Sequence, residues 1–307
     1  MDNAHWSSIY FTQPIISITP LTGGLQHQVD LIELADQSKW IGKAFSLPTW
    51  LGAITRQRLE FTQALATIAA NELDLTFSAR HTEATHVLLT VDGHFALILP
   101  YCEGNVLETV DCKQAYILGN KLAQLHSLQV PIQGAESFPA IRPLSEFAAE
   151  GHYAPWLRKL IDHCNRYRDY EAKHWVVSHR DIHMTNIIWR DSETPHVIDW
   201  ESAGYIHPAI ELVGLAVNCA GMAHATFATE QFQATLLGYA ECAGNLPKMG
   251  AILWAQTLHS WLLWLTYCLE RGWQKEAWQT LKGIEFIHDA MEEMQQLYAT
   301  IYLTFNN

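Results

Sequence analysis

The sequence predicts an α+β protein with two lobes, a small strand-rich lobe followed by a larger helical one. The 307 residues suffice for one large domain or for two lobes. Short β-branched and aromatic runs characterise the first hundred residues, whereas helical patterns dominate from Val106 onward. This change predicts an N-terminal lobe at residues 1–99, a hinge at 100–105 and a C-terminal lobe at 106–307.

The N-terminal lobe is expected to hold an antiparallel sheet of five strands, with one helix inserted after the third strand. Asp92-Gly93 is a strong hairpin signal between the last two strands. The helix is predicted at residues 54–71, where apolar residues recur at helical spacing. The strands are predicted at residues 15–21, 28–34, 40–45, 85–91 and 94–99.

The C-terminal lobe is expected to be mainly helical, interrupted by two short strands at 186–189 and 196–199. Ligands commonly bind in a cleft between lobes, so the functional residues are expected where the lobes meet. The helices are predicted at residues 113–128, 155–172, 208–223, 230–243, 248–271 and 274–299.

The charge balance argues against a nucleic-acid-binding protein. The chain has 19 Lys and Arg residues against 32 Asp and Glu residues, a formal net charge of −13. So few cations, spread over the whole chain, do not make the basic face that binds phosphate backbones. Hydrophobic residues make up 49% and charged residues 17% of the chain, which excludes a disordered protein.

The predicted location is the cytoplasm. No basic start followed by an apolar stretch is visible at the N-terminus, so no signal peptide is expected. The most apolar run, residues 261–269, has about half the length of a membrane span. The six cysteines contain no C-x-x-C pair and are expected to be reduced thiols. We therefore expect a soluble protein without membrane contact and with no obligate protein partner visible in the sequence.

The most informative motif is H-x-D-x-x-x-x-N, with Asp181 and Asn186, followed by an apolar strand. A second apolar strand ends in Asp199, thirteen residues after Asn186. Phosphoryl transfer needs a carboxylate that orients and deprotonates the accepting hydroxyl, and an amide and a second carboxylate that hold Mg²⁺. The spacing therefore predicts catalysis by Asp181 and metal binding by Asn186 and Asp199. The alternative is an ordinary buried turn between two strands.

These motifs resemble the aminoglycoside phosphotransferase and choline kinase superfamily, whose members share a two-lobed protein-kinase-like fold. The resemblance runs from about residue 15 to about residue 281, nearly the whole chain. The stretch from His179 through Asp181 to Asn186 matches the catalytic loop, which implies catalytic roles for His179 and Asp181. The resemblance also implies ATP and Mg²⁺ as cofactors.

Other segments resemble one branch of this superfamily. The spelling Ile-Asp-Trp-Glu-x-Ala-Gly at 198–204 matches the metal-binding segment. Together with Ala-Ile-Glu-Leu at 209–212, it is most similar to the choline kinase and bacterial thiamine kinase branch. The sequence Leu-Ala-Gln-Leu-His at 122–126 resembles the helix that precedes the catalytic lobe.

The third predicted strand carries Lys43, where kinases place the lysine that neutralises the α- and β-phosphates. Glu60, in the following helix, is its predicted partner. The alternatives are a surface lysine and a solvated helix carboxylate. Gly23 and Gly24 are the predicted phosphate loop because they precede this strand, although a glycine pair in a hairpin is usually only a turn.

The predicted hinge has the groups that hold adenine, one backbone carbonyl and, two residues on, one backbone N–H. Pro100 would supply the carbonyl, so its missing N–H is no loss. Cys102 would then donate the N–H. The alternative is a proline that merely ends a strand.

A cationic acceptor is expected to contact an aromatic pair in the C-terminal lobe. Trp261 and Trp264 are three residues apart and share a helix face, where rings can hold a cationic nitrogen. Choline kinases carry a similar pair, and the alternative is a core stripe. Glu201, Glu211 and His183 are further candidates, His183 because the superfamily varies there with substrate. A routine first-turn carboxylate is the alternative for Glu211.

The leading hypothesis is an ATP- and Mg²⁺-dependent kinase that phosphorylates a hydroxyl of a small cationic metabolite such as thiamine or choline. Asn218 stands where relatives that bind these compounds have an acidic residue, which argues against a quaternary ammonium. An aminoglycoside phosphotransferase is the first alternative. It would use carboxylates near the C-terminus, namely Glu270, Glu276, Glu285, Glu292 and Glu293.

Two further classes of function are open. The weak phosphate-loop signal agrees with a pseudokinase, which binds nucleotide without catalysis. The presence of all the predicted catalytic and metal-binding residues argues against it, namely Lys43, Asp181, Asn186 and Asp199. A zinc hydrolase would use His179 and His183, spaced i, i+4, and would need a third ligand on a helix.

Overall fold

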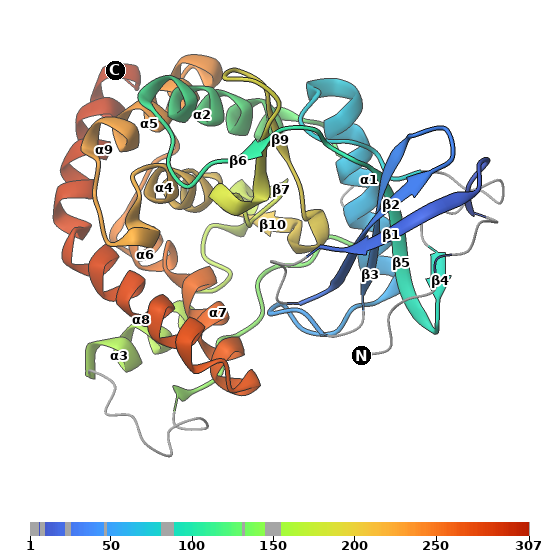
Figure 1. Ribbon diagram of the computed structural model, residues 1–307. Helices are drawn as coiled ribbons and strands as arrows, with labels where there is room; N and C mark the ends of the chain where they lie inside the picture. The colour runs from blue at the N-terminus through green and yellow to red at the C-terminus, as the bar shows by residue number, and fades with distance from the viewer. Residues whose placement is uncertain are drawn as a thin grey trace. The chain divides into compact units, whose positions relative to one another are not determined.

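Figure 1 shows the computed structural model, which describes residues 6, 10–21, 26–45, 48–80, 89–130, 133–144 and 155–306. The chain divides into two compact units. Unit 1 comprises Met1–Asn105, Val130–Ala135 and Ile188–Ala203. Unit 2 comprises Val106–Gln129, Glu136–Ile187 and Gly204–Asn307. The segment that carries Asp199 therefore belongs to unit 1, although it follows the first two parts of unit 2 in the sequence.

Unit 1 contains a five-stranded antiparallel sheet in the order β1-β2-β3-β5-β4. Each of its strands except β4 agrees within one residue with a predicted strand, and residues 85–88 of the fourth lie outside the described residues. The strands are β1 (Ile15–Pro20), β2 (Gln28–Leu34), β3 (Lys39–Phe45), β4 (Leu89–Val91) and β5 (His94–Pro100).

Both faces of this sheet are covered, because successive side chains of a strand point to opposite faces. In β5, Ala96 and Ile98 pack in one cluster with Trp6. Leu97, between them, packs in a second cluster with Leu59 of α1 (Arg56–Leu73). Figure 1 shows α1 beside the strands. Lys43 therefore lies on a central strand, paired with Val29 on one side and Leu97 on the other.

The segment after β5 is held against a second sheet. This sheet has the order β6-β8-β9, formed by β6 (Asn105–Val106), β8 (Ile187–Trp189) and β9 (Pro195–Val197). A Cβ at Gly104 would collide with the carbonyl oxygen of Trp189. Only glycine allows the chain to approach β8 so closely.

Unit 2 is mainly helical, with one two-stranded sheet of β10 (Gly204–Ile206) and β7 (Val176–Ser178). A capping box of Asp111 and Gln114 begins its first helix, α2. Its helices are α2 (Cys112–Ser127), α3 (Pro155–Arg166), α4 (Pro208–Cys219), α5 (Thr229–Ala243), α6 (Ala251–Gln256), α7 (His259–Arg271), α8 (Gln274–Asp289) and α9 (Met291–Phe305).

Helices α2 and α5 are in backbone contact through two glycines. A Cβ at Gly119 of α2 would collide with the backbone of Thr235 in α5. A Cβ at Gly238 of α5 would collide with the backbone of Tyr116 in α2. Because neither glycine has a side chain, the two helix axes come close enough for their flanking polar side chains to meet.

Two predicted helices are each divided in the structure. The helix predicted at 248–271 is divided between α6 and α7 at Thr257, whose hydroxyl donates to the carbonyl of Trp254 over 2.7 Å. The helix predicted at 274–299 is divided between α8 and α9 at Ala290, with φ −85° and ψ 0°. Neither break contains Gly or Pro, so the sequence carries no breaker signal there.

Two further predictions concern membrane-spanning helices and the cysteine thiols. No helix within the described ranges combines the length and the apolar character that a membrane span requires. Each of the six cysteines is a free thiol.

The glycine contact predicts a stability change. Gly238→Ala should lower the free energy of unfolding by about 1–3 kcal/mol, because the added methyl group overpacks the contact with α2. The matched control is Gly214→Ala in α4, where an added Cβ meets nothing within 4 Å. The control should stabilise the protein by roughly 0.5–1 kcal/mol through helix propensity. Urea denaturation of both variants measures this, and shifts of the same sign would contradict the contact.

Candidate active site

In unit 1, Lys43 bridges two carboxylates. Its Nζ lies 2.8 Å from Asp199 Oδ1 and 2.6 Å from Glu201 Oε1. The lysine side chain is only 5% exposed. Burial alone would lower the pKa of Lys43, but the charges of Asp199 and Glu201 raise it above its usual value. Lys43 is therefore a fixed cation at this place.

Glu201, which was predicted to contact the acceptor, belongs to this ion pair. Burial and the charge of Asp199 raise the pKa of Glu201, while Lys43 opposes them. The carbonyl of Glu201 accepts a hydrogen bond from Arg58 Nη2 over 3.3 Å. Arg58 is a buried residue of α1 that the sequence analysis did not identify, since it carries no motif signal.

The predicted pairing of Glu60 with Lys43 is wrong. Glu60 lies 3.3 Å from Arg56 and its side chain is 52% exposed. The face of α1 that turns inward is set by Arg58 and Leu59, which are both buried. Glu201, 158 positions after Lys43, takes the place that Glu60 was expected to fill.

Asp199 has an unusual backbone conformation at this ion-pair cluster. Its φ is 65°, in the left-handed region that non-glycine residues rarely adopt. The next residue, Trp200, anchors the turn because its indole N–H donates to the carbonyl of Val197 over 2.9 Å. The Asp199 side chain remains 44% exposed. One carboxylate of the cluster can therefore still reach a cation.

In unit 2, the loop after β7 brings Asp181, His183 and Asn186 together. The Asn186 amide nitrogen lies 3.0 Å from the carbonyl of Asp181 and 3.1 Å from His183 Nε2. Because its amide hydrogens are used in this way, Asn186 can offer its side-chain oxygen to a cation. His183 Nε2 lies 3.6 Å from Asp181 Oδ1, and both side chains are partly exposed.

His179 is a positioning residue and does not have the catalytic role predicted for it. Its side chain is fully buried, with 0% exposure. Its Nδ1 accepts a hydrogen bond from the backbone N–H of Asp181 over 3.2 Å. A side chain so deeply buried cannot contact an acceptor, but its hydrogen bond holds the backbone of Asp181 in position.

Glu211 is buried beneath the same loop, so its predicted contact with the acceptor is also corrected. Its Oε1 accepts from the backbone N–H of Arg180 over 2.6 Å, and its Oε2 lies 2.9 Å from His126 Nε2. The other ring nitrogen of His126 lies 3.0 Å from the hydroxyl of Tyr239. Burial alone would raise the pKa of Glu211, but the hydrogen bond and charge of His126 lower it.

Arg180 is held in a left-handed conformation, with φ 68°. Its guanidinium donates to the carbonyls of Glu136, over 2.9 Å, and Tyr205, over 3.4 Å. The guanidinium also lies over the ring of Phe138, 4.6 Å from its centroid. These contacts, with Glu211, hold a backbone that is costly for a non-glycine residue.

The predicted tryptophan pair has separate surroundings. Trp261 packs against Gly283 of α8, where a Cβ would be 2.8 Å from its ring. Trp264 stacks on Tyr267 with ring centroids 5.6 Å apart, and Arg271 lies 5.1 Å over the Tyr267 ring. Trp264 therefore belongs to an aromatic group that one cation of the chain already contacts.

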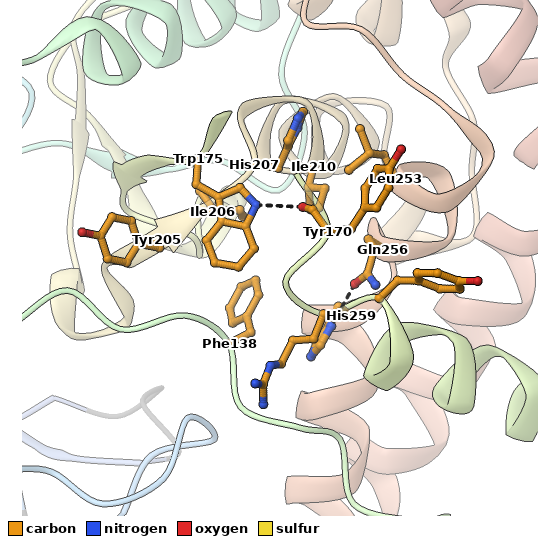
Figure 2. A pocket seen from close by; sticks show the side chains of 12 residues that line it. Phe138, Tyr170, Trp175, Tyr205, Ile206, His207, Ile210, Leu253, Gln256 and His259 are labelled. Carbon is orange, nitrogen blue, oxygen red and sulfur yellow. Dashed lines mark hydrogen bonds between the residues drawn. The ribbon is translucent and has the colours of Figure 1, made fainter. Parts of the chain in front are cut away.

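Figure 2 shows an aromatic pocket in unit 2 that includes neither tryptophan of this pair. Its volume of about 20 Å³ corresponds to roughly one water molecule. One of its lining residues, Phe138, also contacts Arg180 in the loop after β7. The pocket as it stands is too small for an acceptor. Its lining includes Phe138, Tyr170, Trp175, Tyr205, His207 and His259.

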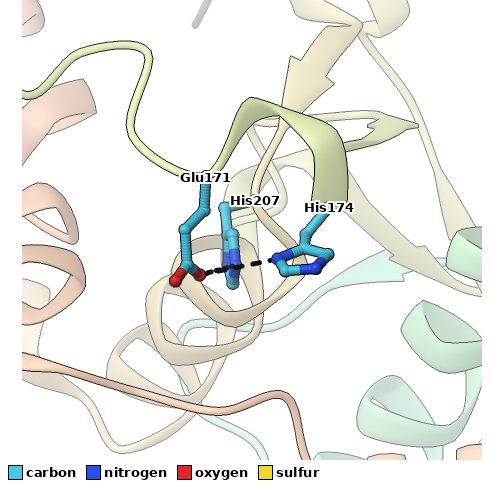
Figure 3. A group of neighbouring side chains, drawn as sticks. All are labelled: Glu171, His174 and His207. Atoms are coloured by element: carbon cyan, nitrogen blue, oxygen red, sulfur yellow. Dashed lines mark ion pairs between the residues drawn. The ribbon is translucent and has the colours of Figure 1, made fainter.

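Glu171, His174 and His207 form a cluster of metal-ligand types in unit 2 (Figure 3). The Glu171 carboxylate lies 3.4 Å from His207 Nε2 and 3.7 Å from His174 Nδ1. However, His207 Nδ1 accepts the backbone N–H of Ala209 over 3.2 Å. The proton of a neutral His207 is therefore on Nε2, the nitrogen that a metal would need. These contacts are better explained as an attachment of Glu171 to His207 at the start of α4 than as a metal centre.

Two further predicted residues, Pro100 and Cys102, lie in unit 1. Pro100 ends β5, and Cys102 follows it as a buried residue. Gly23 and Gly24 lie outside the described residues.

Comparison with known proteins supplies a family. Residues 17–245 match the family described as "Phosphotransferase enzyme family". The chain belongs to this family. The predicted superfamily and the phosphotransferase activity are thereby confirmed. A search of curated protein sequences finds no match.

Solved structures similar to this phosphotransferase include small-molecule kinases. Spectinomycin phosphotransferase, complexed with ADP and spectinomycin, is 13% identical, covers 94% of both chains and gives a TM-score of 0.66. Plasmodium vivax ethanolamine kinase is 13% identical over 91% of this chain and 83% of its own, with a TM-score of 0.64. Choline kinase from Streptococcus pneumoniae is 16% identical over 88% and 94%, with a TM-score of 0.62. This likeness confirms the predicted α+β kinase-like fold.

The buried position of Glu211 predicts a kinetic effect. Glu211→Gln should lower the kcat of this phosphotransferase about tenfold or more, because one of two buried donors would then face an amide N–H. The matched control is Glu241→Gln, an exposed carboxylate that accepts from Tyr116 over 2.6 Å and should leave kcat unchanged. Nucleotide affinity should be unchanged in both variants. A loss in affinity as large as the loss in kcat would contradict a role confined to the catalytic loop.

Proposed function

We propose that the protein is an ATP- and Mg²⁺-dependent kinase that phosphorylates a hydroxyl of a small cationic metabolite such as thiamine or choline. The observation that carries this proposal is the pair of oxygen-donor groups on the two units. Unit 1 presents Asp199 beside the fixed cation Lys43, and unit 2 presents Asp181 with Asn186. These are the groups that phosphoryl transfer requires.

The donor atoms suit Mg²⁺, which prefers oxygen ligands from carboxylates and carbonyls. The Asp199 carboxylate is such a donor in unit 1, and the Asn186 side-chain oxygen is such a donor in unit 2. Mg²⁺, when bound, would neutralise charge on the transferred phosphate. Lys43 would bind the α- and β-phosphates, and Asp181 would orient the acceptor hydroxyl and take its proton.

The end of β5 supports adenine binding at the predicted hinge. The N–H of Tyr101 donates to the carbonyl of Lys39 over 3.2 Å, toward β3. Across a trans peptide the carbonyl and the N–H point in opposite directions, so the carbonyl of Pro100 points away from β3. Under this proposal the carbonyl of Pro100 would accept from adenine, and the N–H of Cys102, two residues on, would donate to it.

The acceptor side favours a small metabolite over an aminoglycoside. Two of the C-terminal carboxylates that an aminoglycoside would need already pair with cations of the chain. Glu270 lies 3.0 Å from Arg142, and Glu285 lies 2.6 Å from Lys282. His183 is the candidate acceptor contact with the closest link to catalysis, because it lies beside Asp181 and is partly exposed.

A pair of substitutions tests the proposed function. Asp181→Asn should lower the transfer rate roughly 10²–10⁴-fold while leaving ATP binding nearly intact. Asp199→Ala should instead abolish the Mg²⁺ dependence of nucleotide binding. Calorimetric titration of ATP at several Mg²⁺ concentrations, together with a coupled ADP assay, separates the two effects. Near-normal turnover of Asp181→Asn would overturn the assignment, and an unchanged Mg²⁺ dependence of Asp199→Ala would favour a pseudokinase.

A cation-selective acceptor pocket at the tryptophan pair is tested by Trp264→Leu. The acceptor KM should rise about tenfold for each 1.4 kcal/mol of lost cation–π contact, with the ATP KM unchanged. Trp278→Leu is the control, since that indole is 62% exposed on α8. A lower melting temperature with unchanged kinetic constants would instead mean that Trp264 only packs against Tyr267 and Trp273.

A further inference from the structure

Two of the six cysteines, Cys112 and Cys242, are exposed thiols in unit 2. Cys112 is the first residue of α2, and Cys242 lies in the last turn of α5. The other four cysteines are buried, and burial raises the pKa of each of their thiols, that of Cys164 to about 12. Because thiol chemistry needs an accessible thiolate, Cys112 and Cys242 are the cysteines that can react with a dissolved oxidant.

The glycine contacts show how α2 and α5 are aligned (Figure 1). A Cβ at Gly238 would lie 3.0 Å from Tyr116 Cα, and a Cβ at Gly119 would lie 2.9 Å from the carbonyl carbon of Thr235. A step of three residues forward along α2 thus corresponds to a step of three residues backward along α5. The two helices therefore run antiparallel, with their backbones in contact at successive levels.

The same alignment, continued toward the start of α2, brings Cys112 opposite Cys242. Cys112 lies seven residues before Gly119, and Cys242 lies seven residues after Thr235. Seven residues are about two helical turns, so each cysteine shares a helix face with the contact residue of its own helix. In antiparallel helices these two steps lead in the same direction. Both cysteines consequently lie on the faces that meet.

Tyr116 shows that the end of α5 lies against the start of α2. Its hydroxyl donates to Glu241 Oε2 over 2.6 Å. The hydrogen bond with Glu241, burial, and the charges of Glu241 and Cys242 raise the pKa of Tyr116. Tyr116 lies about one turn after Cys112 in α2. The residues around Cys242 are therefore held next to the part of α2 that carries Cys112.

The two backbones are close enough for a disulfide, which needs Cα atoms no more than about 7 Å apart. The collision at Gly119 puts its Cα within about 6 Å of Thr235 Cα, because each Cα lies about 1.5 Å from the carbon bonded to it. We infer that Cys112 and Cys242 form a reversible disulfide between α2 and α5 by exchange with a low-molecular-weight disulfide. Neither cysteine is among the proposed active-site residues, so the pair is independent of the proposed function.

The exchange takes two steps and needs no further reactant. The thiolate of one cysteine attacks a sulfur of the small disulfide, forms a mixed disulfide and releases one small thiol. The thiolate of the other cysteine attacks the protein sulfur of the mixed disulfide, forms the bond between Cys112 and Cys242 and releases the second small thiol. Two cysteine sulfurs are oxidised, the small disulfide is reduced, and the two cysteine protons end on the released thiols.

Peptide mapping of the full chain tests this disulfide. The reduced protein is incubated with oxidised glutathione, its remaining thiols are blocked with iodoacetamide, and its unreduced tryptic peptides are sequenced by tandem mass spectrometry. A peptide pair joined through Cys112 and Cys242 is expected. The melting temperature should rise by roughly 5–10 °C, because the bond closes a long loop of the unfolded chain, and dithiothreitol should reverse the rise.

Single substitutions give the controls. Cys112→Ser and Cys242→Ser should each lose the joined peptides and the thermal shift, and the remaining exposed cysteine should stop at the mixed disulfide with glutathione. Cys219→Ala should keep both, although Cys219 lies on the same tryptic peptide as Cys242. Mixed disulfides at both cysteines without a joined pair would overturn the inference. Joined peptides that come only from two different chains, seen as a dimer on a non-reducing gel, would overturn it as well.

Discussion

The carboxylate of Glu211 holds the loop after β7 in place, the loop that carries Asp181 and Asn186. It accepts hydrogen bonds from the Arg180 backbone and from His126, so one buried charge joins α4, α2 and the loop. Charge-assisted hydrogen bonds of this kind are about twice as strong as neutral ones. The contact of His126 with Tyr239 extends the network to α5. The glycine contact between α2 and α5 keeps these two side chains within reach of each other.

Unit 1 also depends on charge-assisted hydrogen bonds, but they serve a different purpose there. Lys43 and Glu201 are largely buried and Asp199 is partly exposed, and in this group one cation meets two carboxylates. Arg58 supports it through the backbone of Glu201. In unit 2 the buried charge fixes a backbone, whereas in unit 1 it keeps Lys43 charged. Under the proposed function, Lys43 would bind phosphate in unit 1 and the loop with Asp181 would act on the acceptor in unit 2.

Local patterns predicted much of the fold and the loop that brings Asp181 and Asn186 together. The strands of the main sheet follow from β-branched runs, and the loop with Asp181 and Asn186 follows from its spacing. Partners distant in sequence could not be predicted. Nothing near Lys43 shows that Glu201 reaches it and Glu60 does not, because this depends on which face of α1 turns inward. Likewise, a carboxylate in the first turn of a helix looks solvated in sequence, yet Glu211 is buried by tertiary packing. The helix breaks at Thr257 and Ala290 lack Gly and Pro and left no signal.

The left-handed backbone of Arg180 makes the loop depend on a contact with a distant part of the chain. A non-glycine residue in this conformation costs about 1–3 kcal/mol, which the surroundings must offset. The hydrogen bond from Glu211 comes from a residue 31 positions later in the chain. The conformation of the loop therefore depends on the packing of α4, which supplies this contact. A local opening that breaks the hydrogen bond from the Arg180 N–H to Glu211 would leave the strained backbone of Arg180 without that support.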